Sequence, residues 1–77
     1  MKNVIIYSTP TCHYCHAAKE FFKENNITYT EKNVAFDRAA GQEAIEKSGQ
    51  MGVPVIDVGG KVVIGFDRGK INQYLGL

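Results

Sequence analysis

The chain has 77 residues, of which 44% are hydrophobic and 22% are charged, and its nine Lys and Arg residues nearly balance its eight Asp and Glu residues. A chain of this length predicts one domain over residues 1–77, and its composition argues against disorder. The near-neutral charge argues against nucleic-acid and polybasic membrane partners. No apolar run approaches the roughly 20 residues of a membrane span, and Met1-Lys2-Asn3 leads into no signal peptide, so a cytoplasmic protein is expected.

The first elements predicted along the chain are a strand and an amphipathic helix. The β-branched and aromatic run from Asn3 to Ser8 is typical of a buried strand, and Pro10 helps to end it. Helical spacing of apolar residues then runs from His13 to Asn25. The apolar face of this helix consists of Ala18, Phe21 and Phe22. A second, more polar strand is expected from Ile27 to Val34, near an edge of the sheet.

A second helix and a hairpin follow. Asp37 can cap a helix that runs to about Lys47, and Gly49 can end it. The apolar stripe of this helix is weak and consists of Ala40, Ala44 and Ile45. Strands are expected from Val53 to Val58 and from Lys61 to Ile64, because the two glycines between them favour a tight hairpin turn.

The last predicted element is a short helix, which Asp67 can cap and which turns Ile71, Tyr74 and Leu75 toward the core. The complete order is β-α-β-α-β-β-α. It predicts an α/β fold with a mixed four-stranded sheet flanked by three helices. The first β-α-β unit is expected to be right-handed with parallel strands, whereas the hairpin makes the last two strands antiparallel.

The two cysteines of the chain, Cys12 and Cys15, lie between the first predicted strand and the first predicted helix. A disulfide across three residues closes a very small loop and stabilises a fold little, so a structural bridge explains the pair poorly. Backbone N–H groups at a helix N-terminus stabilise a thiolate, which is the nucleophile of disulfide exchange. We therefore expect Cys12 to attack a substrate disulfide and the more shielded Cys15 to resolve the mixed disulfide. A protonated His13 would favour the Cys12 thiolate.

The same segment allows other interpretations. Cys12-His13-Tyr14-Cys15-His16 matches the c-type haem attachment pattern, but the chain lacks an export signal and its alternating strands fit no haem-wrapping helical shell. Zinc ligation by the two cysteines and two histidines is disfavoured, because adjacent ligands on one helical turn cannot easily surround a metal ion. A metal ion or iron–sulfur cluster bridged between two chains is the alternative function. Two incidental cysteines are the simplest alternative.

Taken over its whole length, the sequence resembles a known family. The matching segments are Val4–Ser8, Cys12-His13-Tyr14-Cys15, Gly52-Val53-Pro54 and Gly65-Phe66-Asp67. They resemble the glutaredoxins and the related NrdH-type redoxins, and among these the short bacterial glutaredoxin-like proteins of the YruB type. The resemblance implies a thioredoxin-like fold. It also implies a monomeric enzyme that reduces protein disulfides through a Cys12/Cys15 dithiol cycle, without a metal ion or a tightly bound cofactor.

The resemblance further implies roles for individual residues. Val53-Pro54 resembles the family's cis-proline site, which faces the dithiol and presents the Val53 backbone to an extended substrate. Tyr14, Val53 and Asp67 match positions where glutaredoxins hold glutathione, which makes glutathione a candidate co-substrate. Asp67 also has a second explanation as the cap of the last helix, and the two roles are compatible.

Departures from the family pattern bear on the electron donor. Glutaredoxins usually carry Pro at the position of His13, often Lys near Thr9-Pro10, and Thr at the position of Gly52. Each missing charged hydrogen bond is worth roughly 1.5–3 kcal/mol, so weaker glutathione binding is expected. Gly65-Phe66 resembles redoxins that take electrons from thioredoxin reductase. The expected reductant is thioredoxin reductase or glutathione, and the family suggests ribonucleotide reductase and peroxiredoxins as substrates.

Overall fold

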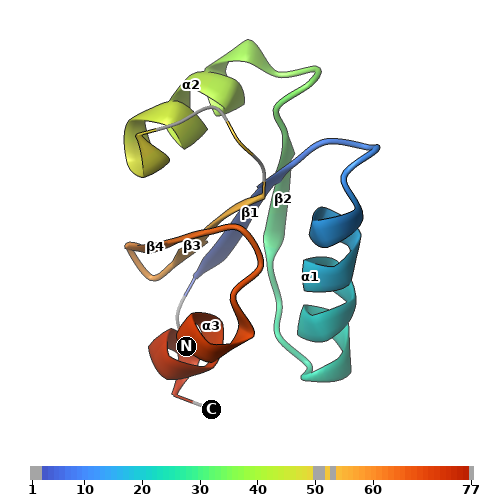
Figure 1. Ribbon diagram of the computed structural model, residues 1–77, viewed down its shortest axis with the longest axis vertical. Helices are drawn as coiled ribbons and strands as arrows, with labels where there is room; N and C mark the ends of the chain where they lie inside the picture. Colours follow the sequence, from blue (N-terminus) through green and yellow to red (C-terminus); the bar gives the residue numbers. More distant parts are fainter. Residues whose placement is uncertain (1–2, 50–51, 53, 77) are drawn as a thin grey trace.

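A computed structural model describes residues 3–49, 52 and 54–76 of the chain (Figure 1). Within these residues the elements are β1 (Val4–Ser8), α1 (His13–Glu24), β2 (Thr30–Asn33), α2 (Arg38–Ser48), β3 (Val55–Val58), β4 (Lys61–Ile64) and α3 (Arg68–Leu75). The strands form one sheet in the order β2-β1-β3-β4. β2 is parallel to β1, whereas β3 is antiparallel to both β1 and β4. The predicted mixed sheet and thioredoxin-like order of elements are therefore confirmed.

The alternation of side chains along β1 divides the core into two layers, one on each side of the sheet. Val4 and Ile6 point to the side of α1 and α3, where they pack in one cluster with Phe22. Ile5 and Tyr7 point to the other side, toward α2. Figure 1 shows α2 across the sheet from α1 and α3. This division follows from the two-residue period of a strand, because a continuous apolar run supplies both faces.

The apolar faces predicted for α1 and α3 are confirmed. The buried face of α1 includes Ala18, Phe21 and Phe22. On α3, Ile71 is fully buried, and Tyr74 and Leu75 are partly buried against the same cluster. The two helices therefore share one hydrophobic core on one side of the sheet.

Capping residues explain where the helices begin and end. The Oδ1 atom of Asp37 accepts a hydrogen bond from the N–H of Ala40 at 3.1 Å, and α2 ends at Gly49 in a left-handed conformation with φ 76°. The Oδ1 atom of Asp67 accepts a hydrogen bond from the N–H of Lys70 at 3.2 Å at the start of α3. As predicted, Asp37 and Asp67 accept hydrogen bonds from backbone N–H groups that have no partner inside their helices, and Gly49 lets the chain turn where α2 ends.

The second strand is shorter than predicted, because it covers Thr30–Asn33 and not Ile27–Val34. The cause lies at the end of α1. Asn26 adopts a left-handed conformation with φ 57°, and the N–H of Ile27 donates to the carbonyl of Phe22 at 2.8 Å. These contacts close the helix, so the next residues return the chain toward the sheet before pairing begins.

Two other predictions are corrected or untested. Ile45, which was expected in the apolar stripe of α2, is 41% exposed, whereas Ala44 is buried. The two residues lie about 100° apart around the helix axis, which places Ile45 beyond the edge of the buried face. Val53 lies outside the described residues, and β3 is described from Val55, directly after the buried Pro54.

Candidate active site

Cys12 caps the N-terminus of α1 and is partly exposed. Its backbone is extended, with φ −86° and ψ 113°, and its Sγ atom accepts a hydrogen bond from the N–H of Cys15 at 3.2 Å. The N–H of Cys12 donates in turn to the carbonyl of Thr9 at 3.3 Å. Free N–H groups at a helix N-terminus favour negative charge, so this sulfur lies where a thiolate is stabilised.

Cys15 differs from Cys12 in its surroundings, because its side chain is 0% exposed. Burial raises the pKa of the Cys15 thiol to about 12, and a hydrogen bond with Cys12 adds to this effect. The backbone N–H of Thr9 and the charge of Lys19 act in the opposite direction. Both thiols are free. The reduced pair therefore has one accessible sulfur and one that is shielded and protonated at neutral pH.

The strand register brings Pro54 to the end of the sheet from which the cysteine loop leaves. Val55 pairs with Tyr7, so the buried Pro54 lies level with Ser8, the last residue of β1. The N–H of Gly65 donates to the carbonyl of Pro54 at 2.8 Å and ties the end of β4 to the same place. The chain segments before Cys12, before β3 and after β4 therefore meet at one edge.

Three other predicted site residues, His13, Tyr14 and Asp67, are exposed, whereas Val53 lies outside the described residues. Tyr14 is 69% exposed in the first turn of α1, and its neighbour His13 is exposed as well. Asp67 is exposed at the start of α3, where its capping role is confirmed. The glutathione contacts of Tyr14, Val53 and Asp67 and the effect of His13 on the dithiol stay predictions.

Sequence reasoning missed a polar cluster behind the cysteines. Glu31 on β2 accepts hydrogen bonds from the Oγ atom of Ser8 at 2.7 Å and from the Nζ atom of Lys19 at 2.8 Å. Ser8 is 0% exposed, and the charge of Lys19 acts on Cys15. One signal was available, because residues four apart on a helix share a face, as Cys15 and Lys19 do. The position of Glu31 follows only from the pairing of β1 with β2.

The geometry argues against the haem interpretation. The Nε2 atom of His16 lies 3.2 Å from the carbonyl oxygen of Pro10, and covalent haem attachment would need Cys15 to be accessible, whereas Cys15 is buried.

Residues 3–49, 52 and 54–76 contain no group of three or more His, Cys, Asp or Glu side chains placed to hold a metal ion. Among the helices that the structure describes, none is both long enough and apolar enough to cross a membrane.

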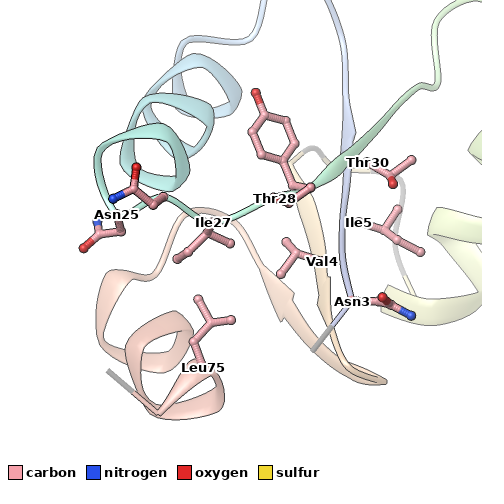
Figure 2. A pocket seen from close by; sticks show the side chains of 10 residues that line it. Asn3, Val4, Ile5, Asn25, Ile27, Thr28, Thr30 and Leu75 are labelled. Carbon is pink, nitrogen blue, oxygen red and sulfur yellow. The ribbon is translucent and has the colours of Figure 1, made fainter. Parts of the chain in front are cut away.

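A pocket of about 720 Å³ lies at the opposite end of β1 from the cysteines. Figure 2 shows its lining, which comes from the start of β1, the segment between α1 and β2, and the end of α3. Asn3, Val4 and Leu75 are among the lining residues. It contains no thiol, so it is separate from the dithiol site.

The glutaredoxin family model matches residues 4–63 of the chain. The chain belongs to the glutaredoxin family. It is 41% identical over 70 residues to an uncharacterised glutaredoxin-like 8.6 kDa protein in the rubredoxin operon of Clostridium pasteurianum, and the match covers 91% of this chain and 93% of that protein. Family and fold, together with the Cys12/Cys15 pair, support a thiol–disulfide oxidoreductase.

Solved structures agree with this assignment. A point mutant of the thioredoxin-like protein BC3987 superposes with a TM-score of 0.90 at 36% identity, over 99% of this chain and 97% of that chain. The glutaredoxin-like NrdH-redoxin from Escherichia coli, described as having a thioredoxin-like activity profile, superposes with a TM-score of 0.81 at 28% identity, over 92% of each chain. The chain is therefore a glutaredoxin-like protein with a thioredoxin fold.

Proposed function

We propose that this glutaredoxin-family protein reduces disulfides on other proteins through a cycle of its Cys12 and Cys15 thiols. The observation that carries the proposal is the difference between the two sulfurs. Cys12 is partly exposed at a helix N-terminus, whereas Cys15 is fully buried one turn away. A large substrate reaches only the first of them.

The first step joins enzyme and substrate. The Cys12 thiolate attacks one sulfur of the substrate disulfide, forms a mixed disulfide and releases the other sulfur as a thiolate. The N–H of Cys15, which donates to the Cys12 sulfur at 3.2 Å, stabilises the attacking thiolate. The resemblance to the family suggests that an extended substrate segment would lie against Val53-Pro54, and the exposed Tyr14 would border the site.

The second step releases the substrate. Cys15 loses its proton to solvent and attacks the Cys12 sulfur, so the Cys12–Cys15 disulfide forms and the second substrate sulfur leaves as a thiolate. Two electrons have passed from the dithiol to the substrate disulfide. Because Cys15 lies in the first turn of the helix that Cys12 caps, and its N–H already donates to the Cys12 sulfur at 3.2 Å, this attack needs little movement of the chain.

We propose thioredoxin reductase as the electron donor that returns the protein to its dithiol form, with glutathione as the competing donor. The chain lacks the Lys that glutaredoxins often carry near Thr9-Pro10 and the Thr that they carry at the position of Gly52, and these are side chains with which the family often binds glutathione. The thioredoxin-like activity profile of the similar NrdH-redoxin supports the same choice. We further propose that the protein acts as a cytoplasmic monomer on substrates such as ribonucleotide reductase or a peroxiredoxin.

The cysteine roles are tested with single serine variants in a reaction with a disulfide-containing protein such as insulin. Cys12→Ser is expected to abolish reduction, whereas Cys15→Ser is expected to accumulate a mixed disulfide that mass spectrometry detects on Cys12. Unchanged reduction by Cys12→Ser would refute the proposal. Purification without oxygen tests the alternative, because a bound iron–sulfur cluster would colour the protein.

The electron donor is tested separately with the oxidised protein. NADPH is supplied either with thioredoxin reductase or with glutathione and its reductase, and consumption of NADPH is followed. We expect rapid reduction with thioredoxin reductase and slow reduction with glutathione. Reduction by glutathione alone would overturn the proposed donor while leaving the dithiol cycle intact.

A further inference from the structure

The resolving thiol lies beside an ion pair that the proposed cycle does not yet use. The Nζ atom of Lys19 is 2.8 Å from Glu31, and the side chain of Lys19 is only 19% exposed. Ser8, fully buried at the end of β1, donates to the same Glu31 oxygen at 2.7 Å. The ammonium group is therefore held against the protein, one helical turn after Cys15, where it acts on that thiol.

The surroundings of Cys15 change when the first step of the cycle occurs. In the reduced pair, burial, the hydrogen bond with Cys12 and the charge of Cys12 all raise the pKa of Cys15. In the mixed disulfide, the Cys12 sulfur is bonded to a substrate sulfur and is neutral, so it is no longer a thiolate that accepts a hydrogen bond from the Cys15 thiol. The two effects due to Cys12 are then lost, while burial remains. The effects that favour the Cys15 thiolate, from Lys19 and from the N–H of Thr9, also remain.

We propose that Lys19, held in place by Glu31 and Ser8, is a positioning residue for the second step, because its charge stabilises the Cys15 thiolate as that thiolate attacks the mixed disulfide. This inference rests on the proposed dithiol cycle. Bond making is unchanged: the Cys12–Cys15 disulfide forms, the substrate thiolate leaves, and the Cys15 proton passes to solvent. Lys19 keeps its own proton throughout.

Other charged and titratable groups face this cluster, and their effects have known directions. The Glu31 carboxylate raises the pKa of Lys19 through its hydrogen bond and so keeps the lysine charged. Lys19 lowers the pKa of Glu31 through its hydrogen bond and its charge, and the charge of His16 lowers it less strongly. Tyr29 also raises the pKa of Lys19. The negative charge of Glu31 partly offsets the positive charge of Lys19. The role of Glu31 is therefore to hold the Lys19 ammonium group in position.

The test follows the second step directly. An aromatic disulfide that releases a coloured thiolate, such as Ellman's reagent, reacts with the reduced protein in two phases. The first phase forms the mixed disulfide on Cys12, and the second releases another thiolate when Cys15 attacks. The rate of the second phase is measured against pH for the wild type and for Lys19→Met, Lys19→Arg, Glu31→Gln and Lys23→Met.

Loss of the Lys19 charge is expected to slow the second phase about three- to ten-fold at neutral pH, which is the order of effect of one nearby charge in a protein. The midpoint of its pH profile should move upward. Lys19→Arg should restore the rate. Lys23→Met is the matched control, because Lys23 is exposed one turn further along α1 and its removal changes net charge equally.

Glu31→Gln separates a charge effect from a structural one. The amide oxygen still accepts from Lys19, and the opposing negative charge is gone, so the second phase should be at least as fast as in the wild type. Slowing by Glu31→Gln equal to that by Lys19→Met would overturn the inference, as would a Lys19→Met profile identical to the wild type. Absence of any second phase in the wild type would instead refute the dithiol cycle itself.

Discussion

Asp67 caps α3 and is proposed also to hold glutathione, and substitutions can separate these two roles. Its Oδ1 atom accepts the Lys70 N–H at 3.2 Å, and the first turn of α3 contains no acidic residue that could replace it. Loss of an N-cap typically costs about 1 kcal/mol, with a range of about 0.5–2 kcal/mol. In a chain of 77 residues, a loss of this size lowers Tm by about 4–8 °C. We expect Asp67→Ala to show this loss.

Asp67→Ser retains a capping oxygen but removes the carboxylate, so its stability should stay near that of the wild type. Urea unfolding followed by circular dichroism measures the stabilities, and the rate of reduction by glutathione measures the second role. If the carboxylate holds glutathione, Asp67→Ser should reduce that rate while remaining stable. The rate of reduction by thioredoxin reductase is measured for the same variants as the comparison.

The matched control is Asp37, which caps α2 through the Ala40 N–H at 3.1 Å. Asp37→Ala should cost a similar free energy of unfolding and should leave the ratio of glutathione to thioredoxin reductase rates unchanged. If Asp67→Ala is as stable as the wild type, the capping argument is wrong. If Asp67→Ser matches the wild type with glutathione, Asp67 is a cap alone.

Unfolding experiments should give three other results. Phe22→Ala, which empties a fully buried site in contact with Phe21, should cost about 3–5 kcal/mol in urea. Lys47→Met leaves the mostly buried Asp57 carboxylate without its 2.7 Å partner and should cost about 1–3 kcal/mol, whereas Lys32→Met, which breaks a more exposed and better solvated pair, should cost clearly less. Hydrogen bonds from Lys19 and Ser8 lower the pKa of Glu31 from 4.5, so the stability they confer is present above that value and is lost as the pH falls through the lower folded value; Glu31→Gln should flatten this loss in a pH series of unfolding curves.

The predictions that succeeded rest on local signals. Asp37 and Asp67 cap helices because a carboxylate followed by a helical pattern is sufficient to satisfy free N–H groups. The hairpin between β3 and β4 follows from two adjacent glycines, and the position of Cys12 follows from the change between strand and helix patterns. None of these requires knowledge of distant contacts.

The features that escaped prediction depend on pairing across the fold. Glu31 reaches Lys19 only because β2 lies beside β1 in a register that pairs Glu31 with Ile6. The exposure of Ile45 depends on how α2 is rotated against the sheet. Sequence spacing indicated that Cys15 would be shielded, but the complete burial of its sulfur depends on the packing around α1.

Cys12 and Cys15 carry the same thiol side chain, so the chemical difference between them arises from their surroundings. In the proposed cycle, Cys12 reacts first because Cys15 is completely buried and a protein substrate cannot reach it. That reaction removes the Cys12 charge and hydrogen bond that help to keep Cys15 protonated, while Lys19 and the Thr9 N–H still favour the Cys15 thiolate. Because the thiolate is the attacking form, the second thiol becomes more reactive when a mixed disulfide is available for it to resolve. In the cycle we propose, the first step therefore prepares the second.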